Sequence, residues 1–171
     1  MAFANPRSQR ASSSSTSTRG WNYDVFLSFR GEDTRHTFTD HLYRALNRKW
    51  IRTFRDTEEL RRGEEIAPEL LKAIEESRIC LIILSKNYAR SRWCLEELAK
   101  IMDCREQMGK LVFPILYHVD PYSEELDTGN HKGAFFYDDR NGDEEGRRKI
   151  ERWREALKTV ANVMGWYLRD G

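Results

Sequence analysis

The chain has 171 residues, which is enough for one domain with a substantial apolar core. Lys and Arg total 29 and Asp and Glu total 28, so the net charge is +1. This balance argues against generic binding to nucleic acid or to anionic membranes, because both usually require a strong basic excess.

The cysteine pattern and the apolar runs place the chain among reduced, intracellular proteins. Cys80, Cys94 and Cys104 form no C-x-x-C pair, which disfavours a disulfide scaffold. No apolar run reaches the length of a membrane span, and the N-terminus lacks the apolar core of a signal peptide. Residues 1–20 are rich in Ser and Thr, so we expect a flexible leader before an ordered domain over residues 21–171.

Short apolar runs mark the strands. The run at 79–84 is the most apolar and is expected to be the central strand. Pro114 cannot donate a backbone hydrogen bond, which suggests that its strand lies near a sheet edge. The expected strands are residues 23–29, 51–54, 79–84, 111–117 and 166–168.

Stretches of helical period separate these strands. Asp33 or Thr34 can cap a helix whose stripe starts at Phe38, Pro68 fits the first turn of the next helix, and Ser91 can cap the third. A fourth stripe starts at Ile150 and is stopped by Gly165. Alternating strands and helices predict an α/β fold with a parallel sheet and helices on both faces.

The helix after the third strand combines an indole with a carboxylate. Trp93 and Glu97 lie one turn apart on one face, and Glu97 lies off the apolar stripe that includes Leu95 and Leu98. Periodicity alone favours a solvated helix face, because glutamates off a stripe are usually hydrated. On that basis a Glu97→Ala change should alter stability by no more than about 0.5 kcal/mol.

Residues 93–98 read Trp-Cys-Leu-Glu-Glu-Leu, which resembles the W-C-L-x-E-L motif of plant Toll/interleukin-1 receptor (TIR) domains. Further stretches resemble other motifs of that family in the same order. They are residues 23–35, 38–42, 60–66, 117–121 and 153–157. The resemblance implies a flavodoxin-like fold with a five-stranded parallel sheet.

The resemblance also implies an enzyme. In the family the Glu before the final Leu is the catalytic residue of an NAD-cleaving hydrolase, which assigns that role to Glu97 and not to Glu96. NAD+ or NADP+ would be the substrate, and no cofactor is implied. A carboxylate beside the ribose can stabilise an oxocarbenium-like transition state, and one suffices because nicotinamide leaves as a neutral molecule.

Three loops are expected to meet at the carboxyl ends of the strands, where parallel sheets bind ligands. Arginines there can pair with a pyrophosphate, glycines allow close backbone approach, and an indole can stack on a base or ribose. The candidate substrate-binding residues are Arg30, Gly31, Glu32, Asp33, Thr34, Arg35, Arg61, Gly63 and Trp93. The histidines and cysteines show no zinc-binding spacing.

The family further implies weak self-association and a larger receptor. The expected contact surfaces contain Asp40 and His41 on the first long helix and Gly165 near the last strand. The family pattern has Ser where Asp40 stands, so we expect weak association. The implied context is a cytoplasmic, and in part nuclear, immune receptor with nucleotide-binding and leucine-rich-repeat modules, in which the TIR domain here would lack its last helix.

Three other functions compete with NAD cleavage. A non-enzymatic adaptor would act only through homotypic contacts. A Cys-His hydrolase built on Cys94 is disfavoured because no motif places a His. A nucleic-acid-dependent cyclic-nucleotide activity, reported for some relatives, is disfavoured by the near-neutral charge, so nucleic acid is an unlikely partner.

Overall fold

The computed structural model describes residues 20–56, 66–120 and 143–169. The expected leader, Arg61 and Gly63 therefore lie outside the described residues. None of the described helices has the length and apolar character needed to cross a membrane. The elements are β1 (Tyr23–Phe29), α1 (Gly31–Thr34), α2 (Phe38–Arg48), β2 (Thr53–Arg55), α3 (Pro68–Glu75), β3 (Ser77–Leu84), the 3-10 turn η2 (Tyr88–Arg90), α4 (Arg92–Met108), β4 (Leu111–Tyr117), α5 (Glu144–Ala161) and β5 (Trp166–Leu168).

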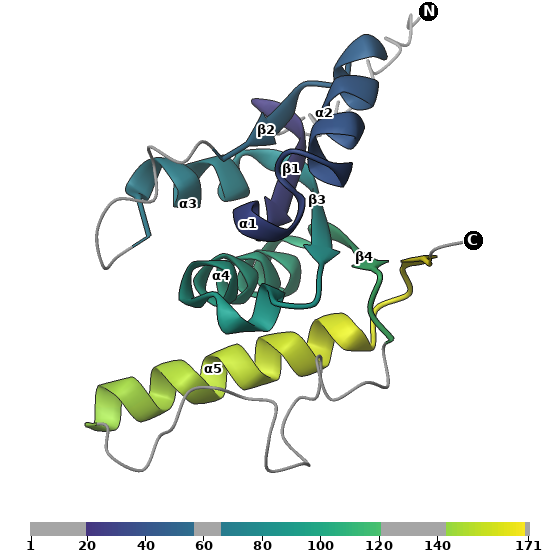
Figure 1. Cartoon of the computed structure of the whole chain (residues 1–171). Coiled ribbons are helices and arrows are strands. Elements are labelled where there is room, and N and C mark those ends of the chain that lie inside the picture. Colours follow the sequence, from purple (N-terminus) through teal and green to yellow (C-terminus); the bar gives the residue numbers. More distant parts are fainter. Residues whose placement is uncertain (1–19, 57–65, 121–142, 170–171) are drawn as a thin grey trace, which may run out of the picture.

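The strands form a five-stranded sheet in the order β2-β1-β3-β4-β5, and every pair is parallel (Figure 1). This confirms the predicted α/β fold and places β3 at the centre of the sheet. Pairing of β4 with β5 begins at Ile115, so Pro114 falls just before the part of β4 that is paired on that side. Its strand is next to the edge strand, as the missing N–H donor suggested.

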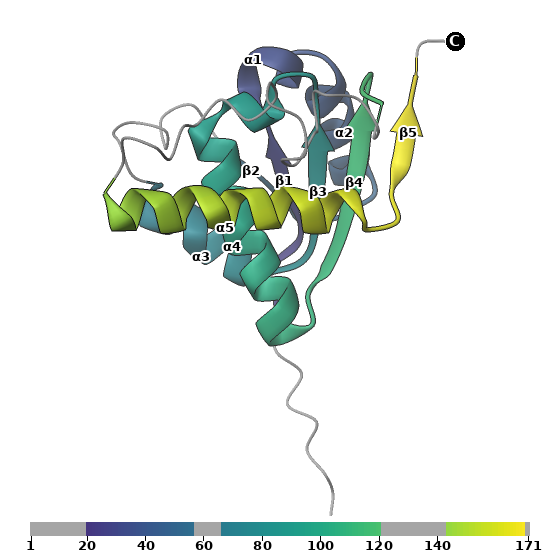
Figure 2. The same cartoon turned by 90° about the horizontal axis from the view of Figure 1, so that it is seen from below.

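Helices cover both faces of the sheet unequally. On one face, α2 is the described long helix that packs over Val25, Leu27 and Phe29 of β1, with partners in β3 and β4. On the other face α3, α4 and α5 share a larger core built on Phe26, Cys80 and neighbouring side chains. Figure 2 shows α5 crossing in front of α4, with α2 behind the strands.

Several predicted boundaries differ from the structure. Neither Asp33 nor Thr34 caps the first long helix, because both belong to the short α1, and Thr37 precedes α2. The second strand starts at Thr53 rather than at residue 51, since Ile51 N–H still bonds the Leu46 carbonyl at the end of α2. Ser91 does cap α4, because its side chain accepts from the Cys94 N–H.

Two residues carry unusual local structure. Lys110 is buried, and its ammonium donates to the carbonyls of Ile74, Glu75 and Ser77, joining the end of α3 to the starts of β3 and β4. Cations are favourable at a helix C-terminus, which accounts for a lysine there. Trp50, in the turn after α2, has a positive φ of 60° and is 93% exposed.

Candidate active site

The candidate site lies where the chain order across the sheet reverses. From β1 the sheet continues to β2 on one side and to β3 on the other, and ligands of open parallel sheets bind at such a point, beyond the carboxyl ends of the strands. Ser28 and Phe29 end β1, and α4 follows β3 by way of η2. This arrangement brings the second turn of α4 against the end of β1.

Glu97 is held at this point by a buried hydrogen bond. Ser28 Oγ and Glu97 Oε2 are hydrogen-bonded at 2.8 Å, and Glu97 is only 1% exposed. The expectation of a solvated glutamate is therefore wrong: the end of β1, rather than water, surrounds the carboxyl group. A Glu97→Ala change would leave a cavity and a buried hydroxyl without this hydrogen-bond partner, so we expect a loss of about 1–3 kcal/mol rather than 0.5.

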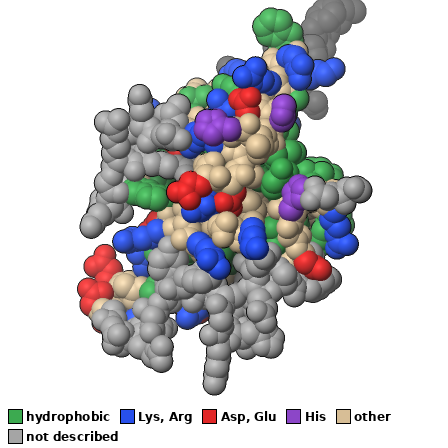
Figure 3. All heavy atoms as spheres, in the orientation of Figure 1, with side chains coloured by type: hydrophobic (Ala, Val, Ile, Leu, Met, Phe, Trp, Pro, Cys, Tyr) green, Lys and Arg blue, Asp and Glu red, His purple; other side chains and the backbone are tan. Residues whose placement is uncertain are grey.

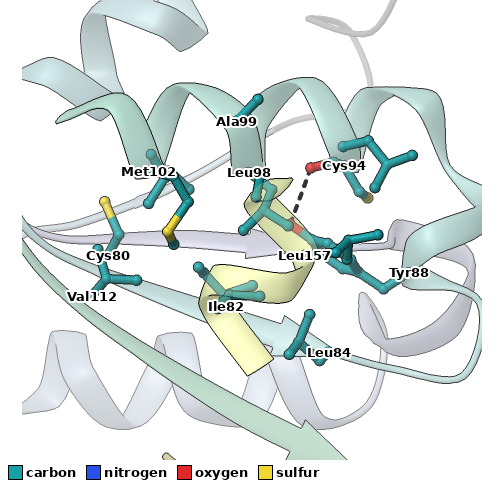
Figure 4. Close-up of a cluster of buried hydrophobic side chains, with 14 of the residues drawn as sticks. Cys80, Ile82, Leu84, Tyr88, Cys94, Leu98, Ala99, Met102, Val112 and Leu157 are labelled. Carbon is teal, nitrogen blue, oxygen red and sulfur yellow. Dashed lines mark hydrogen bonds between the residues drawn. The ribbon is translucent and has the colours of Figure 1, made fainter. Parts of the chain in front are cut away.

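Tyr88 extends this network from η2. Its hydroxyl lies 2.7 Å from Ser28 Oγ and 3.1 Å from the Cys94 carbonyl oxygen. Figure 4 shows the Tyr88 side chain lying within the core and linked to the Cys94 carbonyl. Tyr88 is fully buried, so three elements, β1, η2 and α4, are tied together beside the Glu97 carboxyl.

The adjacent glutamate faces another part of the molecule. Glu96 pairs with Lys149 of α5 at 2.5 Å. Successive helical residues point about 100° apart, so Glu96 turns toward α5 while Glu97 turns toward β1. The structure thus separates the two carboxylates as the motif implied, although the catalytic role of Glu97 stays a prediction.

Asp33 joins the loop after β1 to the loop after β3. Its carboxylate accepts from Ser85 Oγ at 2.6 Å, from the Asn87 backbone N–H at 3.1 Å and from Arg30 Nη1 at 2.6 Å. Burial alone would raise the pKa of Asp33, but the hydrogen bonds from Ser85, Asn87 and Arg30 outweigh it and lower the pKa. Asp33 therefore orders the rim of the site, a structural role that the sequence did not indicate.

The other candidates of this loop are arranged around two arginines. Arg30 pairs with Asp33 and with Glu32, and Glu32 is 80% exposed. Arg35 donates to the Asp56 carbonyl at 2.7 Å and lies over the Phe29 ring. A Cβ at Gly31 would lie 3.0 Å from the Arg35 guanidinium, which is the movable end of a flexible side chain, and the binding role of Gly31 stays a prediction. Thr34 is buried, and its hydroxyl lies 2.8 Å from the Thr39 hydroxyl, so the two form a hydrogen bond. The binding role of Thr34 stays a prediction.

The remaining thiol and aromatic candidates differ in accessibility. Trp93 is half-buried in the first turn of α4, one turn before Glu97. Cys94 is fully buried and its thiol is directed at the Phe29 carbonyl oxygen, 3.6 Å away. A thiol packed in this way is poorly placed for attack on a substrate, which further disfavours a hydrolase built on Cys94.

The predicted interface residues lie on separate surfaces. His41 is exposed on α2, whereas Asp40 is tied to Arg44 at 2.8 Å and to Arg55 at 2.9 Å. Around α2 and over the rest of this face, charged side chains of both signs occur (Figure 3). Glycine at position 165 was expected to let the backbone of another molecule approach. The backbone that approaches it in the structure is that of Pro114 in the same chain. Its interface role stays a prediction.

Two residues of the site escaped sequence reasoning. Ser28 and Tyr88 contact Glu97 directly or through one hydroxyl, yet neither was a candidate. Ser28 could have been noticed, because a lone hydroxyl inside the apolar run of β1 must find a partner when buried. Tyr88 gave no comparable signal, since a tyrosine before a helix is common in surface turns.

Comparison with known proteins gives one consistent result. A family model described as "TIR domain" matches residues 22–170. The chain is 58% identical over 171 residues to "Disease resistance protein RPV1" of Vitis rotundifolia and 50% identical over 158 residues to "TMV resistance protein N" of Nicotiana glutinosa. These matches cover 98% and 89% of this chain but only 12% and 13% of the relatives.

A solved structure shares the fold. The TIR domains of "the activated Roq1 resistosome directly recognizing the pathogen effector XopQ" are 50% identical to this chain, with a TM-score of 0.72. That match covers 85% of this chain and 87% of the solved one. The described sheet and helices therefore correspond to an arrangement found in an experimentally determined assembly.

Proposed function

Because the chain belongs to the TIR domain family, we propose that it is the NAD(P)+-cleaving signalling domain of a plant immune receptor, with Glu97 as its catalytic residue. One observation carries this proposal: Glu97 is held by Ser28 at the point where the strand order reverses. A surface glutamate would need no buried partner at that place.

The reaction would use few groups. Cleavage of the nicotinamide–ribose bond develops positive charge on the ribose, and the Glu97 carboxylate would stabilise it. Nicotinamide leaves with the bonding electron pair as a neutral molecule, so no acid is needed to protonate it. Water then adds to the ribose carbon and loses a proton to solvent.

Binding of the pyrophosphate would fall to Arg30. Its guanidinium lies at the end of β1 and already pairs with the anionic oxygens of Asp33 and Glu32. The Glu32 contact is at the surface and weak, because exposed ion pairs contribute about 0–1 kcal/mol. A phosphate oxygen could replace Glu32 while Asp33 keeps the guanidinium in place.

Self-association would regulate the activity. Glu97 is 1% exposed in the single domain, so a substrate reaches it only when neighbouring groups move. We propose that contacts through the exposed His41 face of α2 favour that open arrangement. Nicotinamide release should then rise more steeply than linearly with protein concentration, and His41→Ala should reduce the rise while Glu97 remains intact.

The direct test is nicotinamide release from NAD+ at high protein concentration. Glu97→Gln keeps the size of the side chain and should lose nearly all activity, whereas the matched Glu96→Gln variant should keep it. An inactive Glu96→Gln with an active Glu97→Gln would shift the assignment by one residue. Activity in both variants would exclude the carboxylate mechanism, and an inactive wild type even in assemblies would favour the adaptor function.

A further inference from the structure

The hydrogen bonds beside Glu97 can be checked by comparing the number of oxygen–oxygen contacts with the number of protons available to fill them. Three oxygen–oxygen contacts run in series: Glu97 Oε2 to Ser28 Oγ at 2.8 Å, Ser28 Oγ to Tyr88 OH at 2.7 Å, and Tyr88 OH to the Cys94 carbonyl at 3.1 Å. Each contact needs one proton. The two hydroxyl groups supply one proton each, and a carbonyl supplies none.

An ionised Glu97 leaves this series one proton short. The carboxylate only accepts, so the single Ser28 proton goes to Glu97. Tyr88 then has one proton for two acceptors, the Ser28 oxygen and the Cys94 carbonyl. One of the two contacts would join a pair of oxygen lone pairs in the core, which buried polar groups rarely tolerate.

We propose that Glu97 is a neutral acid in the free domain and that Ser28 and Tyr88 are positioning residues that hold it so. Glu97 then donates to Ser28, Ser28 donates to Tyr88, and Tyr88 donates to the Cys94 carbonyl. All three contacts carry a proton and all run in one direction. Series of this kind strengthen one another, because each donor is polarised by the next.

Charged groups of the described residues near this point have partners of their own. Arg30, at the end of β1, pairs with Asp33 and Glu32. On α4 itself Glu96 is paired with Lys149 of α5. From β3, burial raises the pKa of the Cys80 thiol to about 12, so this neighbour is uncharged at neutral pH.

If Glu97 is neutral in the free domain, it must lose its proton when NAD+ binds, and this ionisation step rests on the proposed function. The nicotinamide ring of NAD+ is a cation, and its arrival beside Glu97 would favour the ionised form of the carboxyl. The proton would pass to solvent, leaving a carboxylate only while substrate is bound. The free domain would thus keep its reactive group uncharged in the core, where burial disfavours the ionised form of a carboxyl group.

The test compares the pH dependence of folding in wild type and Glu97→Gln. Gln has an N–H that can donate to Ser28, so it reproduces the neutral acid and cannot titrate. A group that is neutral when folded but ionised when unfolded stabilises the fold fully below its unfolded pKa, and the stability is lost as pH rises. From pH 5.5 to 7 the unfolding constant of wild type relative to Glu97→Gln should rise about tenfold per pH unit.

Two controls keep this result specific. Glu96→Gln removes a neighbouring carboxyl group on the same helix. The unfolding constant of wild type relative to Glu96→Gln should not change from pH 5.5 to 7. Tyr88→Phe removes the acceptor of the Ser28 proton, so Ser28 would turn to Glu97 and the sloping region should move to lower pH. A flat wild-type curve against Glu97→Gln would overturn the proposal, and so would a shift to higher pH in Tyr88→Phe.

The pH dependence of unfolding tests the neutral acid, and nicotinamide release tests the proposed function independently. A sloping curve without nicotinamide release supports the neutral acid and rejects the proposed function. A flat curve with Glu97-dependent nicotinamide release does the reverse.

Discussion

Gly165 gives the most direct test of packing near the predicted interface. An alanine Cβ there would lie 2.2 Å from the Pro114 carbonyl oxygen and 2.7 Å from Pro114 Cγ, whereas real Cβ atoms essentially never approach within 3.0 Å. The two backbones would have to separate by about 0.8 Å. Overpacking of this kind costs about 1–3 kcal/mol, and a main-chain oxygen cannot rotate away as a side chain can.

Among the described residues, only a few interactions hold β5, the strand that follows Gly165, in place. β5 pairs with β4 over three residue positions, and Trp166 packs on Phe113 with the ring centroids 5.5 Å apart. Roughly 1 kcal/mol per net hydrogen bond and for the ring contact gives a few kcal/mol in all. The strain is of the same size, so we expect Gly165→Ala to destabilise the domain by about 2–3 kcal/mol and to loosen β5.

Thermal unfolding and hydrogen exchange test this. The melting temperature should fall by about 4–12 °C, given 2–4 °C per kcal/mol for a domain of this size. The His118 N–H, which bonds the Leu168 carbonyl at 2.9 Å, should lose protection. Gly20→Ala is the control, because a Cβ there meets nothing within 4 Å. Wild-type melting and His118 protection in Gly165→Ala would refute the reasoning, and self-association of that variant is interpretable only if β5 remains paired.

Three further perturbations test other features of the fold. Trp50→Gly should raise the unfolding free energy by about 0.5–1 kcal/mol in thermal melts, because glycine adopts the left-handed backbone conformation at this exposed position without strain. A lower unfolding free energy would show that the indole contributes to the fold. Lys110→Met should cost about 2–4 kcal/mol in denaturant titrations, whereas Lys72→Met, at an exposed surface pair, should stay within about 0.5 kcal/mol. Asp33→Asn should remove a stabilisation that wild type holds above the ordinary carboxyl pKa and loses as pH falls through the lowered pKa of Asp33. The difference in unfolding free energy between the two proteins should therefore shrink between pH 6 and pH 3, and a constant difference would contradict the assigned cause.

The fold was predictable because its signals are periodic. The apolar run of β3 and the helical stripe of α4 follow from the order of residue types alone, and they gave the parallel sheet with helices on both faces. The exact start of β2 was not predictable, since it depends on how the turn after α2 closes. Such boundaries are set by single backbone hydrogen bonds that leave no pattern in the sequence.

The candidate site was predictable only in part. The motif singled out Glu97, but helical periodicity predicted that its side chain would be exposed to solvent, whereas it is buried. Periodicity describes a single helix and takes no account of what packs on its other side. The contact with Ser28 joins residues 69 positions apart, and the link from Asp33 to Ser85 joins residues 52 apart. Partners at such separations appear only when the sheet brings the loops together.

The strand order has a consequence for synthesis of the chain. After β2 has paired with β1, β3 joins the free edge of β1, β4 joins β3 and β5 joins β4. No strand has to insert between two strands that are already paired. A ribosome adds roughly 5–20 residues per second, so the sheet can grow one strand at a time as the polypeptide emerges. Each newly made strand is then the template for the next, and the nascent domain exposes a single growing edge throughout.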